Sequence, residues 1–317
     1  MVEQKRKNAL IIGGAGFVGG YLVRELLAQG QTVTLTKMEQ EQVPQGDYHV
    51  KNLNLLDTTE VENVITEINP DFIFHLAAQS SVALSWKNPT LTVDVNIKGS
   101  LNLLECLKKI SYTGRVLMIG SGEEYGKILP EEVPIQEDTV LRPGNIYAAT
   151  KGCQNMLATI YAGAYDLNLI MVRAFNHVGP NQSPQFVVAD FCKQVAEIER
   201  GKKEPVIHVG NLAAKRDFTD VRDVVRAYVS LIEKGIPGET YNVGSGNAYA
   251  IEEILQKIRS KAKKEITVDV DPKKLRPIDV PLITADISKL QRDTGWKPEI
   301  SLDQTIEDTL QYWRETL

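Results

Sequence analysis

The sequence predicts an α/β fold: a Rossmann-type, doubly wound parallel sheet followed by a smaller carboxyl-terminal lobe. Apolar runs typical of buried strands alternate with helical patterns through the first half of the chain, and a glycine-rich segment joins the first strand to the first helix. The length of 317 residues is sufficient for two lobes. We assign residues 1–174, with about 218–243, to the Rossmann domain, and about 175–217 and 244–317 to the second lobe.

Short apolar runs bounded by polar residues mark the strands that we expect in the sheet. They are Ala9–Ile12, Thr32–Thr36, Tyr48–Asn52, Phe72–Leu76, Arg115–Ile119 and Leu169–Ala174. Further along, residues 186–200 and 251–264 have helical patterns, whereas Ile266–Val270 and Leu282–Ala285 have extended ones. Because ligands of such sheets bind beyond the carboxyl ends of the strands, the loops that follow these runs are the expected site.

The first of these loops carries Gly13-x-x-Gly16-x-x-Gly19 between the first strand and the first helix. Glycines in this context let the backbone turn tightly and approach a pyrophosphate, whose charge is favoured at the amino end of a helix. The pattern therefore predicts a dinucleotide site. A glycine-rich turn without a ligand is the alternative, and the flanking strand and helix argue against it.

Lys37 stands at the end of the second expected strand, where NAD-binding chains usually place a carboxylate that accepts hydrogen bonds from the adenosine ribose. Thr36 and Lys37 can donate hydrogen bonds to a 2′-phosphate, which a carboxylate would repel. We therefore expect NADP(H), with NAD(H) as the alternative cofactor. In the second case Lys37 is solvated, and Glu39 or Glu41 folds back onto the ribose.

Tyr147 and Lys151 are four residues apart, so they share one face of a helix that Pro143 and Gly144 precede. A neighbouring ammonium favours the phenolate, and we expect it to lower the tyrosine pKa from about 10 toward the useful range. Ser121 follows another strand and can bind the same substrate oxygen. These three residues predict proton transfer at a carbinol or carbonyl group. The alternative is a structural tyrosine on an amphipathic helix.

Composition excludes several classes of function. The formal net charge of -5 argues against a nucleic-acid-binding scaffold. We expect neither a signal peptide nor a membrane span, and hence a cytoplasmic protein. Cys106, Cys153 and Cys192 are predicted to be reduced thiols, and we expect no metal site because the four histidines lack ligand spacing.

The chain resembles an extended short-chain dehydrogenase/reductase of the nucleotide-sugar branch. The motifs that carry this resemblance are distributed over nearly its whole length. They include the glycine motif, His75-Leu76-Ala77-Ala78, Asn96 with Gly99, Tyr147 with Lys151, Asn176-x-x-Gly179-Pro180, Arg216-Asp217-Phe218, Tyr241-Asn242-Val243-Gly244, Arg276-Pro277 and Gly295-Trp296-Lys297-Pro298. This combination is specific for the family and less specific for the individual reaction.

The resemblance implies a role for each residue of the expected site. The expected cofactor contacts are Gly13, Gly16, Phe17, Val18, Gly19, Thr36, Lys37, Asn54, Leu55, Leu76, Ala77, Ala78, Gln79, Asn96, Tyr147, Lys151 and Phe175. The implied substrate contacts are Ser80, Ser121, Glu123, Asn176, Val188, Lys193, Arg216 and Arg276, and the catalytic residues are Ser121, Glu123, Tyr147 and Lys151. Two guanidinium groups also suit a diphosphate chemically, although either arginine alone could pair with Asp217 or Asp279.

Within this branch, residues 175–187 resemble GDP-sugar enzymes, especially the GDP-4-keto-6-deoxy-D-mannose reductases that make GDP-D-rhamnose. In similar dehydratases, the position of Gly122 often carries an acid or a hydroxyl, and the position of Glu123 carries the base that removes the C5 proton. We therefore expect an NADPH-dependent ketone reductase acting on a GDP-sugar. A GDP-mannose 4,6-dehydratase, an epimerase and a non-catalytic NADP(H)-binding regulator remain as alternatives.

The resemblance also implies a homodimer. The helix with Tyr147 and the helix over about 97–109 would pair with their copies across a two-fold axis. Leu101, Leu104 and Met156 are candidates for this contact, although each could equally belong to the core.

Overall fold

The computed structural model describes residues 6–274 and 282–317. Within this part of the chain, a parallel sheet of seven strands has the order β10-β6-β5-β4-β1-β2-β3. Its strands are β1 (Asn8–Ile12), β2 (Thr32–Lys37), β3 (His49–Asn52), β4 (Phe72–His75), β5 (Arg115–Ile119), β6 (Asn168–Ala174) and β10 (Thr240–Val243). The strand order reverses at β1, because β2 and β3 extend the sheet in one direction and β4 in the other. The doubly wound sheet is thus confirmed, with the six expected strands correct to within one residue at either end.

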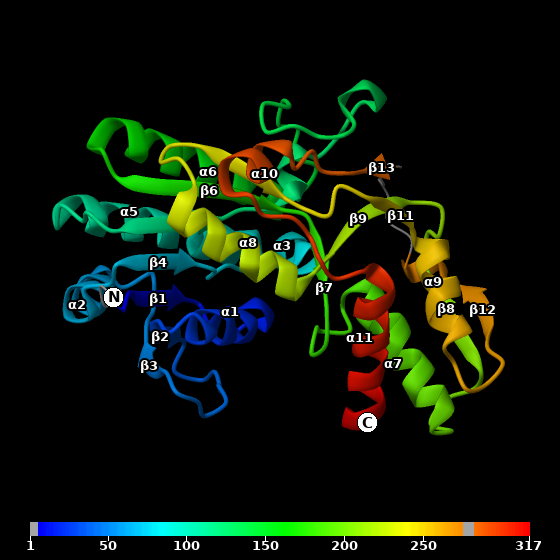
Figure 1. The fold of residues 1–317 in the computed structure, drawn as a ribbon. Helices are drawn as coiled ribbons and strands as arrows, with labels where there is room; N and C mark the ends of the chain where they lie inside the picture. Colours follow the sequence, from blue (N-terminus) through cyan, green and yellow to red (C-terminus); the bar gives the residue numbers. More distant parts are fainter. Residues whose placement is uncertain (1–5, 275–281) are drawn as a thin grey trace.

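Helices cover both faces of this sheet (Figure 1). One face carries α1 (Phe17–Ala28), α8 (Val221–Lys234) and α10 (Ser288–Thr294), and the other carries α2 (Thr58–Ile68), α5 (Gly99–Lys109) and α6 (Ile146–Tyr165). The short helices α3 (Val82–Lys87) and α4 (Pro89–Val93) lead through a π-helical turn, Asp94–Lys98, into α5. A strand buried on both faces must be apolar at successive positions, which explains the continuous apolar runs of the sequence.

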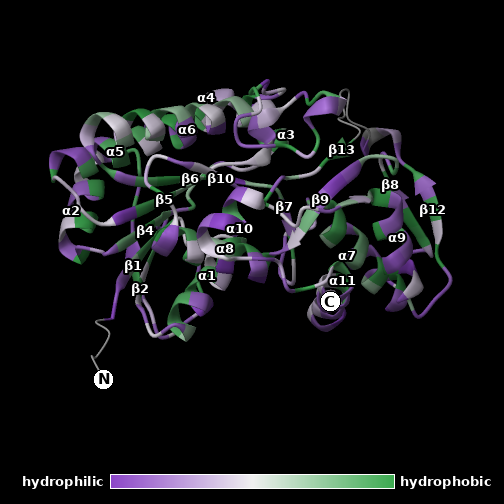
Figure 2. Cartoon of the chain, turned by 45° about the horizontal axis from the view of Figure 1, so that its top comes forward, coloured by the Kyte–Doolittle hydropathy of each residue, from purple (hydrophilic) through white to green (hydrophobic). Residues whose placement is uncertain are grey.

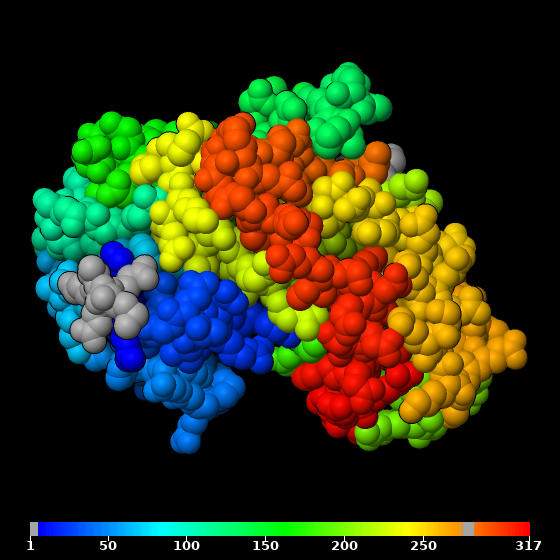
Figure 3. All heavy atoms as spheres, in the orientation of Figure 1, coloured from blue at the N-terminus to red at the C-terminus, as the bar shows by residue number. Residues whose placement is uncertain are grey.

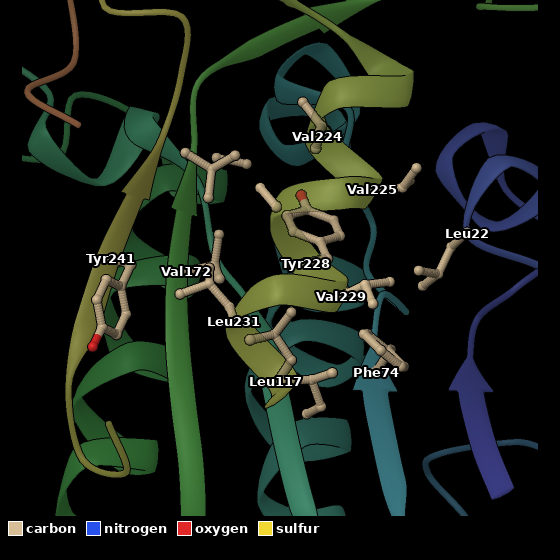
Figure 4. Close-up of a cluster of buried hydrophobic side chains, with 14 of the residues drawn as sticks. Leu22, Phe74, Leu117, Val172, Val224, Val225, Tyr228, Val229, Leu231 and Tyr241 are labelled. Atoms are coloured by element: carbon tan, nitrogen blue, oxygen red, sulfur yellow. The ribbon is translucent and has the colours of Figure 1, made fainter. Parts of the chain in front are cut away.

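Successive residues of each strand enter different cores. In β1, Ala9 and Ile11 pack under α1 and α8, whereas Leu10 and Ile12 pack under α2 and α5. Part of the core under α1 and α8 is drawn in Figure 4, which labels Leu22, Phe74, Leu117, Val172, Val224, Val225, Tyr228, Val229, Leu231 and Tyr241. The apolar side of α8 lies directly against the sheet in this view. Colouring by hydropathy likewise places hydrophobic residues on the strands and on the helix sides that face them (Figure 2).

The remaining elements surround a separate core. They are β7 (Asn176–Val178), α7 (Val187–Glu199), β8 (Val206–Val209), β9 (Lys215–Asp220), β11 (Ala248–Ala250), α9 (Ile251–Ser260), β12 (Thr267–Val270), β13 (Leu282–Ile283) and α11 (Leu302–Thr316). Strand β9 pairs with β7, β11 and β13, and β8 pairs with β12. Helices α7, α9 and α11 enclose the core, on the right of Figures 1 and 3.

Two sequence expectations differ from the observed element bounds. The helix expected over 251–264 ends at Ser260, because Lys261 begins a turn and the Lys263 N–H donates to Glu199 of α7 at 2.9 Å. The extended stretch expected over 282–285 is the two-residue strand β13. In residues 6–274 and 282–317, no helix is both long and apolar enough to cross a lipid bilayer. The same residues contain no group of three His, Cys, Asp or Glu side chains arranged to hold a metal ion.

Candidate active site

The turn after β1 requires glycine for two different reasons. Gly13 has a φ of +79°, and a Cβ there would lie 2.5 Å from the Cα of Ala77 on the neighbouring loop. At Gly19 a Cβ would lie 2.1 Å from the carbonyl oxygen of Gly14, so the first turn of α1 can pack against the loop only without a side chain. Substitution at either position would displace backbone.

The amino end of α1 is suited to an anion. No side chain caps its first N–H groups, and its first turn contains no acidic residue. A Cβ on Gly16 would have no atom closer than 3.9 Å, so the space in front of the helix is open. The first helical residues are Phe17 and Val18, whose backbone N–H groups belong to this unpaired set. The cradle therefore fits the diphosphate of a dinucleotide.

The end of β2 shows how Thr36 and Lys37 are placed. Thr36 is buried, and its Oγ1 accepts a hydrogen bond from the Gly13 N–H at 3.1 Å, so this side chain supports the glycine turn. Lys37 Nζ donates to the carbonyl oxygens of Met38 and Glu39 at 3.2 and 3.0 Å. The Glu41 carboxylate folds back and accepts from the Met38 N–H at 2.7 Å. An ammonium and a carboxylate thus both lie at this strand end.

Asn54 and Leu55, two of the expected cofactor contacts, lie on the loop after β3. Asn54 caps a local turn, since its Oδ1 accepts from the Leu56 N–H at 3.0 Å. Leu55 is buried, and its carbonyl oxygen accepts from the amide of Asn102 on α5 at 2.8 Å. The loop is consequently fixed against α5.

Asn96 organises the loop after β4. It is fully buried, and its side chain exchanges two hydrogen bonds with the backbone of Gln79, at 2.8 and 3.1 Å. It also donates to Thr150 Oγ1 on α6 at 2.9 Å. The Gln79 side chain is engaged by Ser81 and Thr92. Asn96 therefore connects the loop that contains Leu76, Ala77 and Ala78 to the helix that carries Tyr147.

Tyr147 lies beside Ser121, whose side chain acts to lower the tyrosine pKa. Burial raises the pKa of Tyr147 to about 12, and the negative charges of Glu124 and Glu123 act in the same direction. The expectation that the neighbouring ammonium lowers this pKa is wrong for this structure, because burial is the largest influence and the opposing influence comes from Ser121 rather than from Lys151. A tyrosine in this state is protonated at neutral pH, as a proton donor must be.

Lys151 is 3% exposed and is held by two acceptors. Its Nζ donates to the Ile119 carbonyl oxygen at 2.7 Å and to Gln154 Oε1 at 3.0 Å. Burial lowers the pKa of Lys151 to about 8, and the Glu124 carboxylate opposes this lowering. The helical spacing thus brings Tyr147 and Lys151 to one end of β5, as expected.

Glu123 is oriented by the helix that carries Tyr147. Its Oε2 accepts from Asn145 Nδ2 at 3.1 Å, while Asn145 Oδ1 accepts from the Ala148 N–H at 2.8 Å and so caps α6. Between Ser121 and Glu123, a Cβ on Gly122 would meet the ring of Phe175 at 3.3 Å. Asn145 did not emerge from the sequence analysis, although its place just before the helix is a recognisable cap signal.

Glu124 and Arg173 were also missed. They form an ion pair of 2.9 Å beneath the active site, with side-chain exposures of 0% and 8%. Two signals could have revealed them: the Ser121-x-x-Glu124 spacing, which matches a capping box, and an arginine within the apolar strand β6, where a buried charge requires a partner.

The expected substrate residues lie mainly on the second lobe, where they are spread over several elements. Asn176 donates to the Asp217 carbonyl oxygen at 3.3 Å, and Arg216 lies on the adjacent β9. Ser80 is exposed after β4. Val188 is buried in the second-lobe core, so its side chain packs within the protein, and Lys193 Nζ lies 5.5 Å from the Trp313 ring. Arg276 lies outside the described residues.

Contacts between α1 and the β7 loop join the cofactor cradle to the second lobe. The rings of Phe17 and His177 are stacked, with centroids 6.1 Å apart and an interplanar angle of 4°. Tyr21 Oη donates to the Pro180 carbonyl oxygen at 2.8 Å. Burial lowers the pKa of His177, which favours a neutral packed ring over a catalytic role.

Comparison with known proteins gives consistent matches. The family described as GDP-mannose 4,6 dehydratase matches residues 10–309. A GDP-6-deoxy-D-mannose reductase from Pseudomonas aeruginosa is 31% identical over 97% of both chains. The structure of RMD from Pseudomonas aeruginosa complexed with NADPH has a TM-score of 0.87 and 31% identity, covering 98% of this chain and 100% of that chain. A Thermus thermophilus UDP-glucose 4-epimerase complexed with NAD also has a TM-score of 0.87, with 29% identity and the same coverage.

Proposed function

The chain belongs to the GDP-mannose 4,6-dehydratase family of extended short-chain dehydrogenases/reductases, and we propose that it reduces the C4 ketone of a GDP-4-keto-6-deoxy-hexose. The product is the GDP-6-deoxy-hexose, which is GDP-D-rhamnose when reduction of the 4-keto-6-deoxymannose gives the manno configuration at C4. The observation that carries this proposal is the Ser121–Tyr147–Lys151 group beside Gly122, because it contains a proton donor for a ketone and lacks an acid at the position next to Ser121.

NADPH, when bound, supplies the hydride for this reduction. The glycine turn and the amino end of α1 would hold its diphosphate, and Lys37 would pair with its 2′-phosphate. NAD(H) is the alternative, and the Glu41 carboxylate at the Met38 N–H is the feature that favours it. The similar reductase structure contains NADPH and the similar epimerase contains NAD, so relatives with this fold use both cofactors.

Tyr147 transfers its proton to the C4 oxygen as the ketone is reduced. Ser121, which lies beside Tyr147, orients the same oxygen. The raised pKa keeps Tyr147 protonated until the oxygen gains negative charge, and the Lys151 ammonium then stabilises the phenolate that remains. Glu123, which Asn145 orients, accepts a hydrogen bond from the sugar.

The diphosphate of the sugar nucleotide would bind to Asn176, Arg216 and Arg276. Asn176 and Arg216 lie on the paired strands β7 and β9, and β7 begins two residues after the end of β6. Guanidinium groups match the planar oxygen pairs of a diphosphate.

A dehydratase is the second candidate, because Glu123 could still remove a C5 proton. Elimination at C6 also requires an acid for the leaving hydroxyl, and Gly122 has no side chain to provide one. Phe175 fills the space beside Gly122, so a side chain there would need the ring to shift. These features favour reduction over dehydration.

Two reactions test this assignment. One contains GDP-mannose with catalytic NADP⁺, and the other contains GDP-4-keto-6-deoxymannose with NADPH. We expect NADPH oxidation in the second reaction and no efficient formation of 4-keto product in the first. Efficient 4-keto product in the first, without oxidation in the second, would establish the dehydratase instead.

The variant Glu123→Gln distinguishes a reductase from a dehydratase by changing one side chain. A reductase loses one polar contact, about 1 kcal/mol, so ketone reduction stays within about tenfold of wild type. A dehydratase without its base loses roughly two to four orders of magnitude.

We also infer a homodimer in the cytoplasm. Met156 and Ile160 are 56% and 59% exposed on one side of α6, where they could pair with a second copy. Leu104, a candidate from the sequence, is buried in the core beneath α5, so it is unavailable for such a contact. The three cysteines are free thiols, which accords with a reducing compartment.

A further inference from the structure

Glu124 lies directly behind the catalytic residues at the end of β5. Its carboxylate is fully buried and accepts two hydrogen bonds: from the Ser121 N–H at 2.8 Å and from Arg173 Nε at 2.9 Å. Glu124 therefore restrains the backbone of Ser121, the residue whose side chain lies beside Tyr147 and lowers its pKa.

The same short segment also holds Lys151. The Ile119 carbonyl oxygen accepts from Lys151 Nζ at 2.7 Å, and the Gly120 N–H donates to Val172 of β6 at 2.7 Å. Residues 119–121 thus hold Lys151 by a direct hydrogen bond and lie beside Tyr147. Glu124 fixes the far end of this segment at Ser121, which belongs to no strand.

Arg173 extends the restraint across the sheet. Its Nη1 donates to Tyr125 Oη at 3.0 Å and to the Glu137 carbonyl oxygen at 2.8 Å. Tyr125 in turn donates to Asn242 Oδ1 on β10 at 2.6 Å. The buried network therefore connects the end of β5 to β6 and β10, and a displaced Glu124 would disturb several strands.

We propose that Glu124 is a positioning residue, which holds Ser121 in place and keeps a negative charge close to Lys151. The proposal rests on the proposed function. The charged and titratable groups around Glu124 are Arg173 of β6, Lys151 and Tyr147 of α6, and Tyr125 of its own turn.

Electrostatics supports this placement. Burial raises the pKa of Glu124, and the ion pair with Arg173 is the largest influence that opposes the rise. The Glu124 charge in turn counteracts the lowering of the Lys151 pKa by burial. Without this charge, Lys151 loses its proton at a lower pH, and less of the enzyme carries the ammonium that stabilises the phenolate.

Glu124→Gln tests the charge, because glutamine keeps an acceptor for the Ser121 N–H. We expect the alkaline limb of kcat for ketone reduction to move to lower pH. Each pH unit of this movement lowers the rate above the limb about tenfold. The chain offers a matched control: Glu132 also accepts from a backbone N–H three residues earlier and pairs with an arginine, Arg142. Glu132→Gln leaves the limb where it is in wild type.

A second readout needs neither cofactor nor turnover. The protein is labelled with ¹³C at lysine, and Lys151→Met identifies the Lys151 resonance. We expect this resonance to titrate at lower pH in Glu124→Gln than in wild type. If both the Lys151 titration and the alkaline limb of kcat in Glu124→Gln match those of wild type, the proposal is overturned. If wild type itself does not reduce the ketone, the proposed function fails, while the titration still decides the effect of Glu124 on Lys151.

Glu124→Asp provides the test if Glu124→Gln does not fold, as judged by circular dichroism. It keeps the charge but shortens the reach to the Ser121 N–H. We expect kcat to fall at every pH while the Lys151 titration stays near its wild-type position. A wild-type kcat in a folded Glu124→Asp protein refutes the positioning role.

Discussion

Replacing Lys151 by methionine is expected to stabilise the folded protein at neutral pH while removing its activity. Lys151 is 3% exposed, and burial lowers its pKa from 10.5 to about 8. The folded state therefore binds fewer protons than the unfolded chain between these two pH values. Its stability rises with pH through this interval, and below it the buried ammonium imposes its full cost.

The size of the effect follows from the pKa and the two contacts of the ammonium. A fall from 10.5 to about 8 corresponds to about 3 kcal/mol. Methionine removes this cost and keeps an unbranched apolar chain. Gln154 Oε1 loses its donor, which costs about 1 kcal/mol, whereas the Ile119 carbonyl oxygen still accepts from Gln154 Nε2 at 3.1 Å. The expected net gain at neutral pH is about 2 kcal/mol.

Urea unfolding of both proteins across this pH range measures the difference. The free energy of unfolding of Lys151→Met should exceed that of wild type near pH 7, and the excess should shrink as the pH approaches 10.5. Lys51→Met is the control for removing a lysine from the surface, since the exposed Lys51–Glu67 pair is worth about 0–1 kcal/mol. A difference that does not depend on pH, or a destabilised Lys151→Met, would show that burial does not penalise the ammonium as described.

Three further predictions concern the proton donor, the cofactor and the dimer. Tyr147→Phe should lower ketone reduction by about two to four orders of magnitude in steady-state assays, and near-normal turnover in a folded variant would remove Tyr147 from the mechanism. Lys37→Asp should shift the ratio of kcat/KM for NADPH and NADH toward NADH, because it replaces a phosphate donor by a repelling charge; an unchanged ratio would mean that Lys37 does not contact the phosphate. A protein with both Met156→Glu and Ile160→Glu should be monomeric by light scattering at a concentration at which wild type is dimeric, and a dimer of undiminished stability would locate the contact elsewhere.

Local patterns in the sequence were sufficient for the sheet, the glycine turn and the relation between Tyr147 and Lys151. Continuous apolar runs predicted strands because a parallel sheet buries both of its faces, and β1 indeed divides its side chains between two cores. The helical spacing of Tyr147 and Lys151 depends only on α6 itself. Such features are encoded by residues close together in the chain, so a single sequence reveals them.

Other features depend on which strands become neighbours. Thr36 supports Gly13 only because β2 lies next to β1, and Glu124 meets Arg173 only because β5 pairs with β6. The direction of the Tyr147 pKa was expected wrongly because it depends on how deeply the phenol is buried and on which carboxylates surround it. Burial and long-range pairing arise when distant segments pack together. The sequence by itself therefore determined the chemistry available at the end of β5, and the tertiary structure decided how that chemistry is held in place and tuned.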